Sequence, residues 1–277
     1  MSESKHTFCE SGLTQIEPED RLVVLARTIQ TRGSLAEAVL KDRAVDCARF
    51  GEACLGQAVY RHRSIFQNAS EAPVWSHFEL SYFRNVVPED AIFELVVKSQ
   101  PDDIQLLRAE ILLTTPSSFL LPPDWKGLSG RPEWQASMEY IDVDSAHLDE
   151  YRDVMRDYCG PAAAKLVGAN KVGTFRAMET LVVLYRDPEF SIDWNQVHLC
   201  ELDADGFNGF GQAFKAALRD DSPDGAEIAD VFADLDRIRT VSRWTFNHPV
   251  LEADLAVGRE GKAQPLAEPD VEDFYPG

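Results

Sequence analysis

The chain has 277 residues, 44% of them hydrophobic, and a formal net charge of −20. This length and composition allow a buried core in one large domain or two small ones. The negative charge repels phosphate backbones and anionic lipids, so it argues against nucleic-acid and membrane-surface partners. No segment approaches the roughly 18 consecutive apolar residues that a membrane helix needs.

The cysteines and the first residues bear on the cellular compartment. The five cysteines are scattered and odd in number, and the first residues contain no apolar signal region. Disulfides are rare in proteins that stay in a reducing compartment. We therefore expect a cytoplasmic protein with free thiols.

The first half of the chain alternates between strand and helix patterns. Ser34 and Glu37 form a capping box that predicts the start of a helix. Pro-Asp/Glu-Asp triplets at 88–90 and 101–103 are typical of helix N-termini. The predicted elements are a strand at 22–29, a helix from 35 toward 60, a strand at 74–83, helices at 89–99 and 102–113, and a short strand at 117–121.

The second half repeats this order more clearly. Period-2 alternation and β-branched residues predict strands, and apolar residues spaced at three and four predict helices. The predicted elements are a strand at 136–143, a helix at 145–167 interrupted near Cys159, strands at 172–185 and 194–202, helices at 207–218 and 227–239, and a strand at 240–247.

This order predicts two repeats, at 20–130 and 132–248, between a flexible arm at 1–19 and an acidic, Pro-rich tail at 249–277. Their third strands contain the same residue types, Trp, His and Glu, near Trp75 in one repeat and near Trp194 in the other. An internal duplication explains the match, and so does chance, because the match has gaps.

Four segments of the second repeat carry a resemblance to a known superfamily. They are Met138–Val143, His147–Arg152, Lys165–Gly168 with Phe175, and 194–202. The pattern resembles the dimeric α+β-barrel superfamily, most closely its cofactor-free monooxygenase-like and NIPSNAP-like members. The resemblance implies an α+β fold in which two ferredoxin-like βαββαβ repeats pack sheet to sheet as an α+β barrel. Some members of the superfamily hold haem through a histidine, so the resemblance also implies that this chain could bind haem in that way.

The strand at 194–202 has two different faces. If helices cover one face, Val197 and Leu199 should pack beneath the helical phenylalanines. The opposite face then carries Trp194, Gln196, His198 and Cys200. Apolar walls with a few convergent polar groups are typical of ligand pockets. We therefore expect a pocket between the two sheets with His198 facing it.

The chemistry-bearing residues each have a second, purely structural interpretation. His198 could act as a general base or be a histidine satisfied within a sheet core. His77 is its counterpart in the first repeat. Arg176 could hold a substrate carboxylate or join an interstrand ion pair. Cys200 is two residues from His198, about 6.5 to 7 Å along a strand, which is loose for an activated thiolate.

Aromatic residues complete the predicted site. Tyr140 could bind a substrate carbonyl, although a packing role is the alternative. Trp75, Trp194 and Gln196 are expected as pocket walls. The sequence contains no Gly-x-Ser-x-Gly, Cys-x-x-Cys, His-Glu-x-x-His or P-loop motif, so no metal site is predicted.

These observations lead to three hypotheses. The first is a small-molecule enzyme, monomer or homodimer, that acts on an apolar or aromatic metabolite and needs no cofactor. Its reaction would be proton abstraction or cofactor-free lyase, isomerase or monooxygenase chemistry, with His198 as the base. The second is a haem protein with His198, His77 or His147 as the iron ligand. The third is a non-catalytic binding or interaction module.

Overall fold

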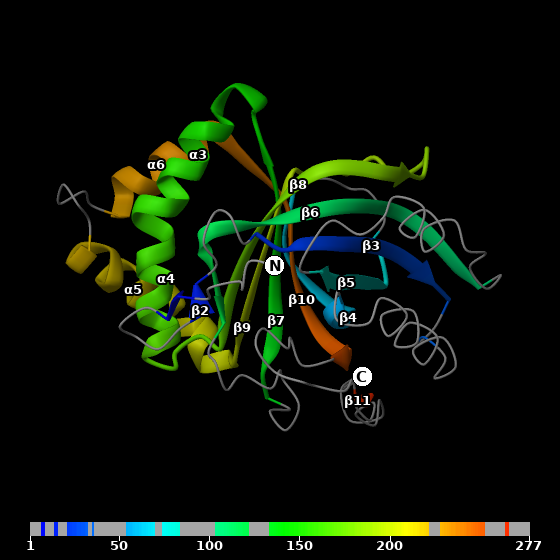
Figure 1. The fold of residues 1–277 in the computed structure, drawn as a ribbon, viewed down its shortest axis with the longest axis horizontal. Helices are drawn as coiled ribbons and strands as arrows, with labels where there is room; N and C mark the ends of the chain where they lie inside the picture. Colours follow the sequence, from blue (N-terminus) through cyan, green and yellow to red (C-terminus); the bar gives the residue numbers. More distant parts are fainter. Residues whose placement is uncertain are drawn as a thin grey trace, which may run out of the picture.

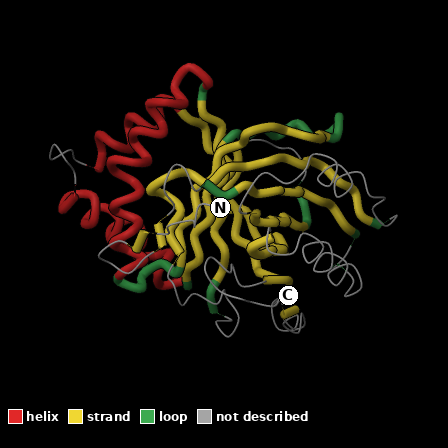
Figure 2. The backbone as a smooth tube through the Cα atoms, in the orientation of Figure 1, coloured by secondary structure: helices red, strands yellow, loops and turns green. Residues whose placement is uncertain are grey.

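The computed structural model describes residues 7–8, 14–15, 21–32, 35, 54–69, 74–83, 103–121, 133–221, 228–252 and 264–265. Within these ranges the protein consists of antiparallel strands with helices in its second half (Figures 1 and 2). No helix in them is long and apolar enough to cross a membrane.

In the second half of the chain, strands and helices follow the order that the sequence predicts. The strands are β1 (Thr7–Phe8), β2 (Thr14–Gln15), β3 (Val23–Thr31), β4 (Cys54–Asn68), β5 (His77–Phe83), β6 (Ile104–Leu121), β7 (Gln135–Val143), β8 (Thr174–Arg186), β9 (Gln196–Leu202), β10 (Arg239–Glu252) and β11 (Gln264–Pro265). The helices are the 3-10 turn η3 (Ser145–His147), α3 (Leu148–Val154), the π-helix η4 (Met155–Cys159), α4 (Gly160–Gly168), α5 (Ala204–Asp221) and α6 (Ile228–Ile238).

The strand order confirms the predicted fold class. In the first repeat the order is β6-β3-β5-β4, and in the second it is β10-β7-β9-β8, which is the same ferredoxin-like order. Antiparallel pairing of β4 with β10 and of β6 with β8 joins the two sheets into a closed ring. A closed ring removes the sheet edges that would otherwise pair with other chains. The bounds of the arm, the repeats and the tail stay predictions.

Two helix predictions in the first half are wrong where the structure describes the chain. The segment predicted as a helix at 102–113 is part of β6, and residues 54–60 belong to β4 rather than to a helix. Both faces of β6 are buried, with Ala109 and Ile111 on one face and Arg108 and Glu110 on the other. The charged residues on one face of β6 give the sequence the polar positions expected of an amphipathic helix. The pairing of β6 with its neighbouring strands outweighs this local preference. Residues 36–53 and 84–102 lie outside the described residues.

The expectation of free thiols is wrong at one position. Cys54 is disulfide-bonded, whereas Cys159 and Cys200 are free. An odd number of scattered cysteines in a sequence does not reveal which of them pair.

Two separate cores hold the second repeat. One fills the barrel, where the rings of Trp75 and Trp194 lie 5.6 Å apart and that of Tyr140 lies 4.7 and 4.9 Å from them. The other lies between the outer face of β7–β10 and the helices, and includes Tyr151 and Phe214. In Figure 1, α3, α4, α5 and α6 gather together on one side of the molecule.

Paired charges complete the barrel interior. Arg176 donates to Glu201 at 2.8 Å, and Glu201 also accepts from Thr174 at 2.7 Å. Arg108 lies 2.7 Å from Glu110, which also accepts from the indole of Trp194. Charged side chains that water cannot reach need such partners, because an isolated buried charge is strongly unfavourable.

We predict that Arg176→Met lowers the free energy of unfolding by about 3–5 kcal/mol, because it leaves Glu201 as an uncompensated buried charge. Urea denaturation followed by circular dichroism measures the change. The matched control is Arg156→Met, because the ion pairs of Arg156 with Asp153 and Asp157 are exposed and should contribute little to stability. Equal effects of the two substitutions would contradict the prediction.

Candidate functional site

The two faces of β9 are the reverse of the expectation. Val197 and Leu199 belong to the barrel core, whereas His198 lies on the face that the helices cover. The expected inter-sheet position of His198 is therefore wrong. The error comes from Trp194, which precedes the first residue of β9 and does not follow the alternation of the strand. Its ring is in the barrel, so grouping it with His198 placed both on the wrong side.

Most of the predicted site residues are structural groups of the barrel interior. Trp75, Trp194 and Tyr140 pack against one another, and the Tyr140 hydroxyl donates to the Met138 sulfur at 3.4 Å. Arg176 forms the interstrand ion pair with Glu201, which was the alternative to a substrate-binding role. None of the four borders the cavity described below.

The two remaining predicted polar residues are buried at equivalent positions. Gln196 and His77 are the first residues of β9 and β5, so His77 corresponds to Gln196 rather than to His198. Neither borders the cavity. The His77 ring contacts the Ser76 hydroxyl at 2.9 Å, and burial, the largest influence, lowers its pKa to about 4. A neutral, buried imidazole there has a packing role.

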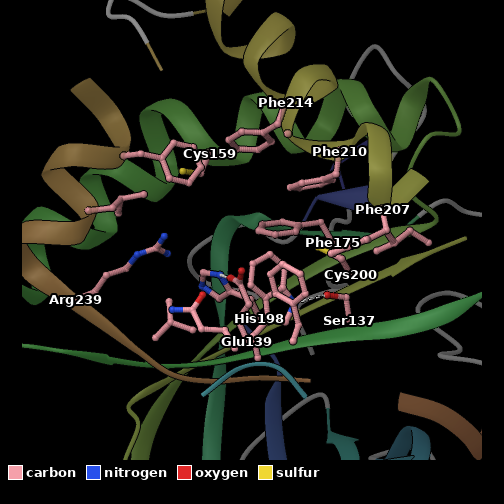
Figure 3. Close-up of a pocket in the computed structure, with 18 of the residues that line it drawn as sticks. Ser137, Glu139, Cys159, Phe175, His198, Cys200, Phe207, Phe210, Phe214 and Arg239 are labelled. Atoms are coloured by element: carbon pink, nitrogen blue, oxygen red, sulfur yellow. Dashed lines mark hydrogen bonds and ion pairs between the residues drawn. The ribbon is translucent and has the colours of Figure 1, made fainter. Parts of the chain in front are cut away.

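A cavity of about 540 Å³ lies between the outer face of the second sheet and the helices (Figure 3). Its volume is within the range of small-molecule sites, roughly 300–1,000 Å³. The sheet side carries the polar groups Ser137, Glu139, His198, Cys200 and Arg239. The aromatic walls are Phe66, Phe175, Phe207, Phe210, Phe214, Phe232 and Trp244.

The π-helix η4 shapes one wall of this cavity. Met155 and Cys159, its first and last residues, both border the cavity. Pro161, two residues after Cys159, has no N–H to donate to the preceding turn, and its ring crowds the carbonyl four residues earlier. A single widened turn relieves this conflict, and such turns are frequent at functional sites.

A row of three polar side chains crosses the floor of the cavity. The Tyr151 hydroxyl lies 2.9 Å from His198 Nε2, and His198 Nδ1 lies 3.6 Å from Glu139 Oε2. Glu139 and His198 are cross-strand neighbours on β7 and β9. The Glu139 side chain is 23% exposed and that of His198 5%. Glu139 is therefore the more accessible member, with His198 held between it and Tyr151.

The electrostatics keep Glu139 ionised. Burial, the largest influence, raises its pKa, but the contact with His198 and the charges of His198 and Arg239 together outweigh burial, so the pKa lies below its ordinary value. Burial raises the pKa of Tyr151 well above the ordinary range, so its hydroxyl stays protonated. The site thus offers one carboxylate, one imidazole, one phenol and one guanidinium.

The two thiols at the cavity are unreactive. Burial raises the pKa of Cys159 to about 12 and that of Cys200 well above its ordinary value. The thiolate is the nucleophile in cysteine chemistry. Cys200 therefore stays protonated, and its predicted contact with a substrate stays a prediction, since it borders the cavity.

The residues present do not fit a haem ligand set. Both ring nitrogens of His198 are already in contact with Tyr151 and Glu139. His77 is away from the cavity, and His147 lies on η3 with its Nδ1 2.8 Å from Glu150. The cavity thiols are protonated, and a thiolate is needed for iron. Among the described residues no cluster of three His, Cys, Asp or Glu side chains could hold a metal ion.

Three groups of the site escaped the sequence analysis: Glu139, Tyr151 and Arg239. Glu139 could have been found, because it alternates with Met138 and Tyr140 and so shares the outer face. Tyr151 fits the helical spacing of apolar residues at 145–167, and that spacing does not indicate a polar role. Arg239 lies where α6 ends and β10 begins, and no local pattern indicates which way such a side chain points.

Comparisons with known proteins give similarity in fold only. No protein-family model and no curated protein matches the sequence. Solved structures resemble the chain at very low identity. An anthrone oxidase-like protein has 10% identity, covers 93% of this chain and 99% of its own, and has a TM-score of 0.49. A cyanide-bound chlorite dismutase variant from Candidatus Nitrospira defluvii has 10% identity, coverage of 82% and 91%, and a TM-score of 0.42.

A dye-decolorizing protein from V. cholerae has 6% identity, covers 81% of this chain and 92% of its own, and has a TM-score of 0.43. At these identities and TM-scores the similarities say nothing about the ligand or the reaction of this chain. The narrower resemblance to NIPSNAP-like and cofactor-free monooxygenase-like proteins stays a prediction.

We predict that His198→Ala raises the pKa of Glu139 above its ordinary value, because the contact that outweighs burial is removed. In the native protein the folded pKa is the lower one, so the stability that Glu139 contributes is present above the unfolded pKa and is lost as the pH falls through the folded pKa. A carbon-13 NMR titration of the glutamate carboxyls measures the shift. His147→Ala, which removes a surface partner of Glu150, should leave Glu139 unchanged.

We predict that added hemin gives no Soret band of a histidine-ligated iron, because His198 has no free ring nitrogen. Absorption spectroscopy of the purified protein with hemin checks this. A sharp Soret band that disappears in His198→Ala would show that the ring turns toward iron, and would restore the haem hypothesis.

Proposed function

We propose that the protein is a small-molecule enzyme that removes a proton from a largely apolar or aromatic compound bound in the cavity between the second sheet and the helices. Proton removal of this kind begins lyase and isomerase reactions and cofactor-free oxygenation, and so covers the reaction types expected from the sequence. The observation that carries the proposal is an ionised carboxylate, Glu139, on the polar floor of an aromatic-walled cavity.

Glu139 is the proton acceptor in this proposal, in place of His198. It is the more exposed of the pair, and neither ring nitrogen of His198 is free. The C–H bond of the substrate breaks, the proton passes to a Glu139 carboxylate oxygen, and the electron pair remains on the substrate as an enolate or phenolate. The lowered pKa of Glu139 makes it a weak base, so the proposal requires a substrate whose C–H is acidic.

His198 and Tyr151 are positioning residues for this carboxylate. His198 Nδ1 faces Glu139 at 3.6 Å, and its Nε2 shares a hydrogen bond of 2.9 Å with the Tyr151 hydroxyl. The ring then supports the negative charge of Glu139 without touching the substrate. Phe175 packs edge-on against the ring at 5.7 Å and restricts its rotation.

We predict that the protein accelerates exchange of the acidic C–H protons of 2-tetralone, an aromatic ketone, with deuterium from the solvent, as followed by NMR. Glu139→Gln should lower this rate at least about 100-fold, because the amide cannot accept the proton. His198→Asn should lower it less and move the pH–rate profile toward higher pH, because the pKa of Glu139 rises.

The matched control is Glu150→Gln, which removes the carboxylate of another Glu–His pair, with Nδ1 of His147 at 2.8 Å, on the protein surface. It should leave the rate unchanged. A Glu139→Gln variant as fast as the native protein would discard the proposal. A native rate no greater than that of buffer would favour the non-catalytic binding module.

A further inference from the structure

Arg239 is a half-buried cation that forms no ion pair with a carboxylate in the described part of the chain. Its buried Nε donates no hydrogen bond there, and the one polar side chain that its guanidinium contacts is the neutral Tyr151 hydroxyl. Figure 3 shows the side chain extending into the cavity from the strand side. Burial alone would lower its pKa, but nearby Tyr151, Glu139 and Cys159 raise it, so the group stays charged.

Three fully buried arginines are arranged differently. Arg27, Arg108 and Arg176 each lie within 2.9 Å of a carboxylate, on Glu79, Glu110 and Glu201 respectively. The fold thus neutralises these buried guanidiniums with a built-in anion. At Arg239 the nearest acidic group of the cavity floor, Glu139, is engaged by His198, and Asp236 is exposed.

We infer that the ligand of this cavity is an aromatic compound with an anionic group, such as a carboxylate or a phenolate, that Arg239 binds. The inference rests on the proposed function for the identity of the site and adds the substrate class. The planar guanidinium fork matches a carboxylate in two parallel hydrogen bonds. The aromatic walls accept a ring in edge-to-face contact.

The local charge is consistent with one bound anion. On the floor, the negative charge of Glu139 is supported by His198, and Tyr151 and the thiols are uncharged. A cationic ligand would lie against Arg239, and like charges in a desolvated site repel strongly. A neutral ligand would leave the guanidinium without a partner, which costs binding energy.

Isothermal titration calorimetry of the whole protein with three probes tests the inference. The probes are 2-naphthoate, 2-naphthylmethanol and 2-naphthylmethylammonium, which share a ring system and differ in charge. The native protein should bind 2-naphthoate at least about tenfold more tightly than the other two, the effect of one charge-assisted hydrogen-bond pair. Arg239→Gln should abolish this preference without changing the melting temperature by more than a few degrees.

The matched control is Arg237→Gln, two residues earlier on α6, whose exposed side chain pairs with Glu150. It should retain the preference. The inference is overturned if the neutral or cationic probe binds as tightly as 2-naphthoate, if Arg239→Gln keeps the preference, or if no probe binds at about 1 mM.

Binding requires no turnover, so this result is separable from the test of proton removal. A preference for 2-naphthoate that persists in Glu139→Gln, together with no exchange of 2-tetralone protons, would leave the substrate class intact and discard only the proposed reaction. Normal exchange of the 2-tetralone protons without a preference for 2-naphthoate would leave the proposed reaction intact and discard the anionic substrate class.

Discussion

The pairing of β4 with β10 and of β6 with β8 is the constraint on which the arrangement of the site depends. Once the ring is closed, one face of every strand points into a barrel of fixed width, and that space is filled by stacked rings and by pairs such as Arg176–Glu201. The candidate cavity lies instead on the outer face, where the distance between sheet and helices is set by side chains and not by backbone hydrogen bonds.

The outer faces of the two repeats show what distinguishes a structural ion pair from a candidate site. Glu79 and His198 are each the third residue of their strand, and their cross-strand partners are Arg27 and Glu139. The Arg27–Glu79 pair is at most 2% exposed, whereas Glu139 is 23% exposed and borders a cavity. The same position in a duplicated framework is thus closed in one repeat and open to a small molecule in the other.

The sequence predicted the fold class and most second-repeat elements, because strand alternation and helical spacing are local properties. It also predicted that His198 and Cys200 share a face. It could not say which face the helices cover, since both faces of β9 are buried and both carry polar groups. Arg108 and Glu110 show the same difficulty. They pair with each other and with the distant residues Asp193 and Trp194, whereas the local pattern of charged residues indicates solvent exposure.

The overall charge and the local charge of the cavity act over different ranges. A formal charge of −20 repels anions at long distance, but solvent and salt screen that field beyond about 8–10 Å. Inside an aromatic-walled cavity the screening is weaker, so a single guanidinium without a protein carboxylate dominates the choice of ligand. The apolar surface of the ligand provides most of the affinity, and Arg239 provides the preference for an anion. The contribution of this residue is therefore measured by comparing the affinities of equally apolar probes, and not by the affinity of any one probe.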